Sequence, residues 1–213
     1  MRKPASSGIC WRKPGILLFL FLGSLLFLPA CGQKPPVAEI RSPQGMVEFN
    51  REENAPFAEA REKTGVPLGG AVRTGKESAA DLHFLQEIGQ ISLRENAFFQ
   101  LQSGSLIGKQ LSGTAIFNIK KQEMEIHIET PHGNTTVLGT EFSQQVSSAG
   151  LILAVKTGVV EFASLRGEKR KVAAGEKLVV EKDSSLSDPV KMDLMEQLNL
   201  FSNNAGKANI NQQ

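Results

Sequence analysis

The residues best arranged for chemistry are Glu125, His127 and Glu129, which occupy alternate positions in one segment. In an extended strand their side chains share one face, with successive side chains about 7 Å apart. They could begin a metal site, but a neighbouring strand would have to supply further ligands. The other two histidines are His83 and His132. We interpret the Glu125–Glu129 segment as a solvated strand face and predict neither a metal nor a cofactor.

Sequence motifs for nucleophilic catalysis or phosphate binding are not found. The segment Gly104–Lys109 is followed by Gln110, where a phosphate-binding loop needs Ser or Thr after its lysine. None of the serines lies in a G-x-S-x-G motif. The sequence therefore predicts no catalytic residues and no enzymatic activity.

Cys31 ends an N-terminal segment that has three parts. Basic residues come first (Arg2, Lys3, Arg12 and Lys13), an apolar run extends to Leu28, and Pro29-Ala30 precede the cysteine. The run is shorter than the ~20 residues that a membrane-spanning helix needs, a layout typical of a secretory signal peptide. Leu28-Pro29-Ala30-Cys31 resembles the lipobox of bacterial lipoproteins, whose cysteine is lipidated and becomes the first residue of the mature chain.

We therefore predict a lipoprotein signal peptide over residues 1–30 and lipidation at Cys31. Acyl chains would hold the mature protein in the cell envelope, facing the periplasm. Gly32 stands where Asp often signals retention in the inner membrane, so the outer membrane is favoured over the inner membrane. The alternative is an uncleaved membrane anchor in which Cys31 is a buried thiol.

The charge of the mature chain differs from that of the whole sequence. The whole sequence has 24 basic and 22 acidic residues, a net charge of +2. The predicted leader holds four basic residues and no acidic ones, so its removal leaves 20 against 22, a net charge of −2. A chain this close to neutral argues against nucleic acid as a partner. Both cysteines, Cys10 and Cys31, lie at or before the cleavage point, so the mature fold contains no disulfide.

Residues 45–182 show hydrophobic alternation with a period of two. Ala80, Leu82 and Phe84 alternate with other residues, and the pattern recurs around Phe99, Phe117, Ile126 and Leu153. Glycine-rich turns such as Ser103-Gly104-Ser105 separate the runs. Short strands separated by regular turns predict one all-β domain, either a β-roll or solenoid-like stack or a sandwich.

Two segments flank this predicted domain. Residues 31–44, with Pro35-Pro36, predict a flexible tether that lifts the domain off the bilayer. Residues 183–213 predict a short helix and a disordered tail. The helix is expected to begin at Ser187-Asp188-Pro189, since Val190, Leu194, Leu198 and Phe201 recur at helical spacing; a frayed tail is the alternative. From Ser202 the chain is rich in Asn and Gln and is predicted to be disordered.

Four short motifs occur in order within the predicted domain. Gly69–Gly75 reads G-x-x-V-R-T-G, and Thr130–Phe142 reads T-P-x-x-x-x-x-V-x-G-T-x-F. Val155–Val160 reads V-x-x-G-x-V, and Ala174-Gly175-Glu176 follows. In the order and spacing of these motifs the chain resembles the periplasmic domain of the FecR family, over roughly residues 45–180. Two positions differ from the usual pattern: Leu138 replaces an Arg before Gly139, and Phe57 replaces a Trp upstream of the first motif.

The motif residues are predicted to be mainly structural. They are Arg73, Thr74, Gly75, Thr130, Pro131, Gly139, Thr140, Gly158 and Gly175. Glycine allows a positive φ where strands turn, and threonine can bond to nearby backbone. Arg73 is expected to form a charge-assisted bond to a carbonyl or carboxylate rather than to bind a ligand.

The resemblance implies a role in signalling and interaction rather than catalysis. The classical FecR members are inner-membrane sensors with a cytoplasmic anti-sigma segment and one membrane-spanning helix. We expect neither here, so the relay to a sigma factor is not carried over.

Three functional hypotheses follow. The leading one is a non-catalytic envelope lipoprotein whose β-domain binds an envelope protein or glycan, with strand edges suited to strand addition. The alternative is a sensory component that receives a signal from an outer-membrane receptor, such as one for iron uptake. The third is a scaffold without a specific ligand.

Overall fold

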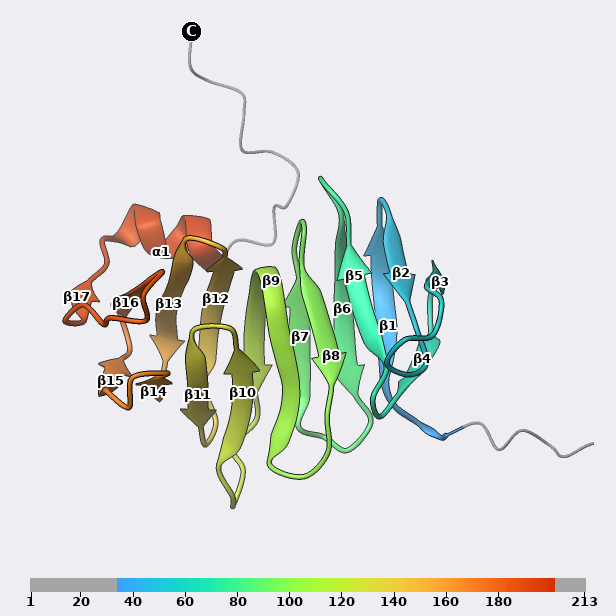
Figure 1. Cartoon of the computed structure of the whole chain (residues 1–213), viewed down its shortest axis with the longest axis horizontal. Helices are drawn as coiled ribbons and strands as arrows, with labels where there is room; N and C mark the ends of the chain where they lie inside the picture. The colour runs from blue at the N-terminus through green and yellow to red at the C-terminus, as the bar shows by residue number, and fades with distance from the viewer. Residues whose placement is uncertain (1–33, 202–213) are drawn as a thin grey trace, which may run out of the picture. The chain divides into compact units, whose positions relative to one another are not determined.

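Alternating apolar side chains produce two β-sheets in the computed structural model, which describes residues 34–201 (Figure 1). The prediction of an all-β domain is confirmed. Every strand pairing is antiparallel except that of β9 (Leu106–Ile119) with β10 (Ile126–Thr130), which is parallel. Figure 1 shows β1–β4 at one end of this unit and β14–β17 at the other.

The strands of the first sheet follow one another in space in this order: β4 (Thr64–Pro67), β1 (Pro36–Gln44), β6 (Ala79–Phe84), β7 (Gly89–Leu93), β9, β12 (Glu141–Ser147), β13 (Gly150–Thr157), β16 (Glu176–Glu181) and β17 (Val190–Lys191). The strands of the second sheet follow in this order: β3 (Ala58–Glu59), β2 (Val47–Phe49), β5 (Ala71–Thr74), β8 (Phe98–Leu101), β9, β10, β11 (Gly133–Val137), β14 (Val159–Ser164) and β15 (Lys169–Ala173). After β9 the chain adds its strands in pairs. β10 and β11 lie in the second sheet, β12 and β13 in the first, β14 and β15 in the second, and β16 and β17 in the first.

β9 belongs to both sheets. Its first half pairs with β8 in the second sheet, and its second half pairs with β7 and β12 in the first. The strand bends from one sheet into the other at Gly113, which has a φ of 77°. A Cβ at this position would lie 2.3 Å from the Cα of Ala97, so only glycine fits the bend.

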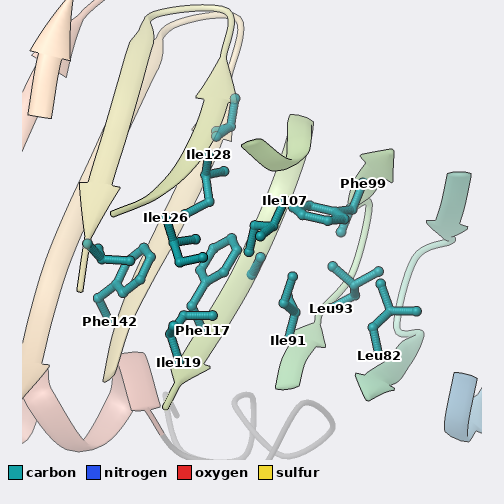
Figure 2. Packing of buried hydrophobic residues seen from close by; sticks show 14 of the residues in the cluster. Leu82, Ile91, Leu93, Phe99, Ile107, Phe117, Ile119, Ile126, Ile128 and Phe142 are labelled. Atoms are coloured by element: carbon teal, nitrogen blue, oxygen red, sulfur yellow. The ribbon is translucent and has the colours of Figure 1, made fainter. Parts of the chain in front are cut away.

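Aliphatic and aromatic side chains from both sheets fill the core (Figure 2). Phe99, Phe117, Phe142 and Phe162 are completely buried. The ring of Phe117 stacks on that of Phe142, with centroids 4.6 Å apart, and meets the ring of Phe99 edge-on at 6.0 Å. Burial of this apolar surface is the main force that holds the two sheets together.

β1 corrects the predicted tether over residues 31–44. Ala38 and Ile40 are completely buried, and β1 pairs with β4 on one side and β6 on the other. Burial of alternate apolar side chains favours pairing of this extended segment in the sheet over a free, solvated tether. The domain therefore begins at Pro36 rather than at residue 45.

The predicted short C-terminal helix is confirmed, but it begins later than predicted. The helix α1 (Leu194–Phe201) begins after Asp193, whose Oδ1 accepts the backbone N–H of Glu196 at 2.8 Å, so Asp193 is its N-cap. Ser187 instead accepts the backbone N–H of Val179 at 3.0 Å, and Val190 belongs to β17. The β-structure thus continues past the predicted boundary at residue 182.

Two predicted segments lie outside the described residues. They are the signal peptide with Cys31 and the tail from Ser202. Within residues 34–201, no helix is long and apolar enough to cross a membrane.

Candidate functional site

The first motif connects β2 and β5 with each other and with the turn between β7 and β8. Arg73 Nε donates to Glu48 Oε2 at 2.7 Å, and the Arg73 guanidinium lies 4.2 Å from the centre of the Phe57 ring. Glu48 and Arg73 are directly opposite each other in the pairing of β2 with β5. Thr74 Oγ1 accepts the backbone N–H of Ala97 at 2.9 Å and donates to the carbonyl of Arg94. Arg73 and Thr74 therefore fix strand positions.

Arg94 and Gly75 lie next to Thr74 in this part of the structure. Burial lowers the pKa of Arg94 from its ordinary value, and the nearby charge of Asp81 opposes this shift. The backbone N–H of Gly75 donates to the carbonyl of Met46 at 2.9 Å. A Cβ on Gly75 would lie 2.6 Å from Met46 Cε, so glycine allows the close packing of this side chain.

The second motif fixes a turn and a strand entry. Thr130 Oγ1 donates to the carbonyl of Gly133 at 2.8 Å and accepts the backbone N–H of His132 at 3.2 Å, which closes the turn at Pro131. Thr140 is buried, and its carbonyl accepts the backbone N–H of Ile119 at 3.0 Å. The hydrogen bonds of this motif thus define local backbone geometry.

The third and fourth motifs also lie at close backbone approaches. A Cβ on Gly158 would lie 2.7 Å from Thr140 Cγ2, so the second and third motifs pack directly on each other. The carbonyl of Gly175 accepts the backbone N–H of Met192 at 2.8 Å, which positions the chain after β17. The four motifs thus lie at separate places along the two sheets, and the contacts described for them are with neighbouring parts of the chain.

The chemically capable residues are engaged in the fold. His127 Nδ1 lies 3.0 Å from Thr136 Oγ1, and Glu129 pairs with Lys109 at 3.0 Å. His132 is buried, and its Nε2 donates to the carbonyl of Ser147 at 2.7 Å. Glu125 precedes β10 rather than continuing the face of the strand. Within the described residues, no group of three or more His, Cys, Asp or Glu side chains could hold a metal ion.

The edge strands are poorly suited to strand addition. β3 and β17 have two residues each, and β4 ends at Pro67, which has no N–H to donate. On β15, Glu176 accepts the backbone N–H of Ala173 at 3.0 Å, and the Arg170 side chain donates to the carbonyl of Lys169 at 3.1 Å. Short or capped edges protect a sheet from pairing with other chains. A partner would therefore meet a sheet face more readily than an edge.

Two hollows meet at Phe84, where β6 turns toward β7. The polar hollow has a volume of about 260 Å³ and is lined by His83, Phe84, Glu87, Gln90, Asn118 and Lys120. The second hollow, which we call the apolar hollow, has a volume of about 120 Å³. Its apolar lining consists of Val37, Leu68, Phe84, Ile88 and Ile107, and its rim also includes Gln86, Gln102, Ser103 and Gly104. The polar hollow is the best candidate for a binding site on the outer face of the first sheet.

The register of three strands positions the polar hollow. His83 on β6 is opposite Gln90 on β7, and Gln90 is opposite Asn118 on β9. Side chains in such a cross-strand row lie about 5 Å apart. Lys120 and Glu87 form an ion pair at 3.7 Å beside the row. The hollow thus offers both donors and acceptors to a polar ligand or a partner segment.

Comparison with known proteins identifies the domain. The family model described as FecR protein matches residues 70–161. Residues 70–161 are a FecR domain. The match extends from β5 into β14 and includes every residue that lines the polar hollow. The resemblance inferred from the sequence motifs is thereby confirmed.

Solved structures show the same fold. Two crystal structures of a "putative anti-sigma factor" from Parabacteroides distasonis superpose with TM-scores of 0.54 and 0.53, at 14% and 15% sequence identity. Each comparison covers 62% of this chain, and it covers 65% of the first Parabacteroides chain and 64% of the second. The chain therefore spans slightly less than two thirds of the length of those proteins. No curated protein matches the chain.

Proposed function

We propose that this protein is a non-catalytic bacterial envelope lipoprotein whose FecR domain binds a partner, either an envelope protein or a glycan. The observation that carries the proposal is the polar hollow, an open row of imidazole and amide groups inside the matched FecR region. The polar residues elsewhere are weaker candidates for a binding site, because His127, His132 and Glu129 already have partners within the fold.

The chemistry of the polar hollow fits recognition by hydrogen bonding. Gln90 and Asn118 each carry an amide that can donate and accept, and His83 adds a ring nitrogen. Phe84 contributes an apolar surface beside them. Such a combination can bind the backbone of a protein segment or the hydroxyl groups of a glycan.

A photo-crosslinking amino acid at Asn118 tests this proposal in intact cells. Asn118 is exposed on the outer face of the first sheet. We expect a discrete crosslinked product whose mass spectrum identifies a protein or a glycan. The matched control is the same amino acid at Lys171, an exposed position on β15 of the second sheet. Identical products from both positions, or none from Asn118, would contradict the proposal.

Membrane attachment is tested by Cys31→Ala. If lipid on Cys31 anchors the protein, this substitution should move it from the membrane fraction to the soluble periplasmic fraction. The measurement is immunoblotting of fractions after a salt wash, with separation of inner and outer membranes for the unaltered protein. We expect the unaltered protein in the outer membrane. A variant that remains fully membrane-bound would show that the lipoprotein assignment is wrong.

A second candidate function is a role in signal relay. The supporting observation is that the structures with the same fold are described as an anti-sigma factor. In this role the domain would receive a signal from an outer-membrane receptor and pass it to another membrane protein. Capture of such a receptor by the Asn118 crosslinker would favour relay, whereas capture of a glycan would favour simple attachment.

A further inference from the structure

Several turns between strands lie together at the end of the FecR domain where the chain enters β1, and backbone hydrogen bonds join them. The backbone N–H of Leu85, in the turn between β6 and β7, donates to the carbonyl of Val37 at 2.9 Å. The N–H of Gly69, in the turn between β4 and β5, donates to the carbonyl of Leu101 at 3.0 Å. Residues 120–125 join them, because the N–H of Lys120 donates to the carbonyl of Ile88 at 2.9 Å. We call this surface the entry end; it comprises residues 68–70, 85–88, 102–105, 120–125 and 138.

The entry end exposes large apolar side chains on its turns. The exposed fractions are 37% for Leu68, 48% for Leu85, 71% for Met124 and 50% for Leu138. Leu138 lies beside the loop of residues 120–125, since its carbonyl accepts the backbone N–H of Gln122 at 2.7 Å. The apolar hollow, which includes Leu68 and Ile88, is part of the same surface. Turns usually carry polar residues, so this set of side chains points to a partner that is itself apolar.

The distance from Cys31 to the domain limits what that partner can be. The domain begins at Pro36, five residues after Cys31. Five residues span at most roughly 18 Å, whatever their conformation. An acylated Cys31 lies at the headgroup level of the bilayer. The start of β1, and with it the entry end, would therefore stay close to the lipid surface.

We propose that the entry end of the FecR domain rests on the lipid bilayer, with Leu68, Leu85, Met124 and Leu138 in contact with the interfacial region. This inference rests on the lipidation of Cys31 proposed above. Lys34, Lys120 and Lys121 are exposed near this end and can meet lipid phosphates, but Glu87, Glu123 and Glu125 offset their charge. The contact is therefore mainly apolar. The polar hollow, which shares Phe84 with the apolar hollow, then lies just above the headgroups.

Depth-dependent fluorescence quenching tests the contact in the mature, lipidated protein. In that protein the thiol of Cys31 is blocked by lipid and Cys10 has left with the leader, so an added cysteine is the only reactive thiol. Leu85→Cys and Met124→Cys would each carry an environment-sensitive fluorophore. The control is Leu165→Cys, a 68% exposed leucine between β14 and β15, at the other ends of the strands. The vesicles contain phosphatidylethanolamine and phosphatidylglycerol, with a lipid spin-labelled near the headgroup as the quencher.

We expect the spin-labelled lipid to cause a large loss of fluorescence from the probes at positions 85 and 124, and no loss at position 165. Equal quenching at all three positions, or none at 85 and 124, would overturn the inference. Intact mass measured beforehand separates this failure from failure of the proposed function. A mature chain without lipid on Cys31 overturns both, whereas lipid on Cys31 with unquenched probes overturns only the bilayer contact.

Discussion

Replacement of Phe117 by alanine is expected to lower the free energy of unfolding by about 3–5 kcal/mol. The Phe117 ring is completely buried and stacks on Phe142 while touching Phe99, so truncation removes contacts to both sheets at once (Figure 2). The surrounding rings are held by separate strands and can fill the cavity only in part. Urea denaturation of the purified protein, followed by circular dichroism, measures the change.

Leu165→Ala is the matched control for this experiment. Leu165 is also a large apolar residue, but it is 68% exposed. Its truncation should change the free energy of unfolding by less than about 0.5 kcal/mol. Similar values for the two variants would mean that the aromatic stack is not the centre of the core.

Gly139→Ala is expected to destabilise the fold by about 3 kcal/mol, because overpacking and backbone strain act together. Gly139 has a φ of 155°, and a Cβ there would lie 2.5 Å from the Cα of Lys121. Lys121 Cα is a backbone atom, so the neighbouring loop must move to make room. The melting temperature of the variant, measured by differential scanning calorimetry, should fall by several degrees.

Gly167→Ala separates the clash from the strain. Gly167 also has a positive φ, 83°, but a Cβ at that position would meet nothing within 4 Å. This variant should lose only about 1 kcal/mol, the cost of placing alanine in a left-handed conformation. If Gly139→Ala cost no more than Gly167→Ala, the close approach to Lys121 would not explain the glycine in this motif.

The strands were predictable where one face of the sheet is buried. The alternation at Ala80, Leu82 and Phe84 predicted β6, and the alternation around Phe117 predicted the second half of β9. In both strands every second side chain faces the core, so apolar residues recur at every second position of the sequence. The bend at Gly113 was not predictable, because it depends on the approach of Ala97 from another part of the chain.

Local signals failed at the two ends of the domain. β1 carries a correct alternation at Ala38 and Ile40, but the prolines around it favoured an extended tether, and only pairing with β4 and β6 decides the outcome. At the other end, Ser187 has the residue type of an N-cap but bonds to β16 instead. Asp193 with Glu196 three residues later was the better signal for the start of α1.

The polar hollow could not be found from the sequence. Its row consists of His83, Gln90 and Asn118 from three strands, and only the pairing register places them side by side. Amide side chains on outward positions are common in strands, so nothing in Gln90 or Asn118 alone distinguishes a binding row from an ordinary solvated face. The motif residues were recognisable because their local backbone demands, such as close approach at Gly139, leave a sequence pattern.

The alternate placement of strand pairs beyond β9 affects how the domain can change in size. Each strand pair is hydrogen-bonded to the previous pair in the same sheet; β14, for example, pairs with β11 on one side and with β15 on the other. Strand pairs could therefore be gained or lost at the C-terminal end during evolution, while the bend of β9 at Gly113 and the packed rings of Phe99, Phe117 and Phe142 stay intact. Such a domain can change in length at its C-terminal end while the part that contains β1 and the aromatic stack stays the same.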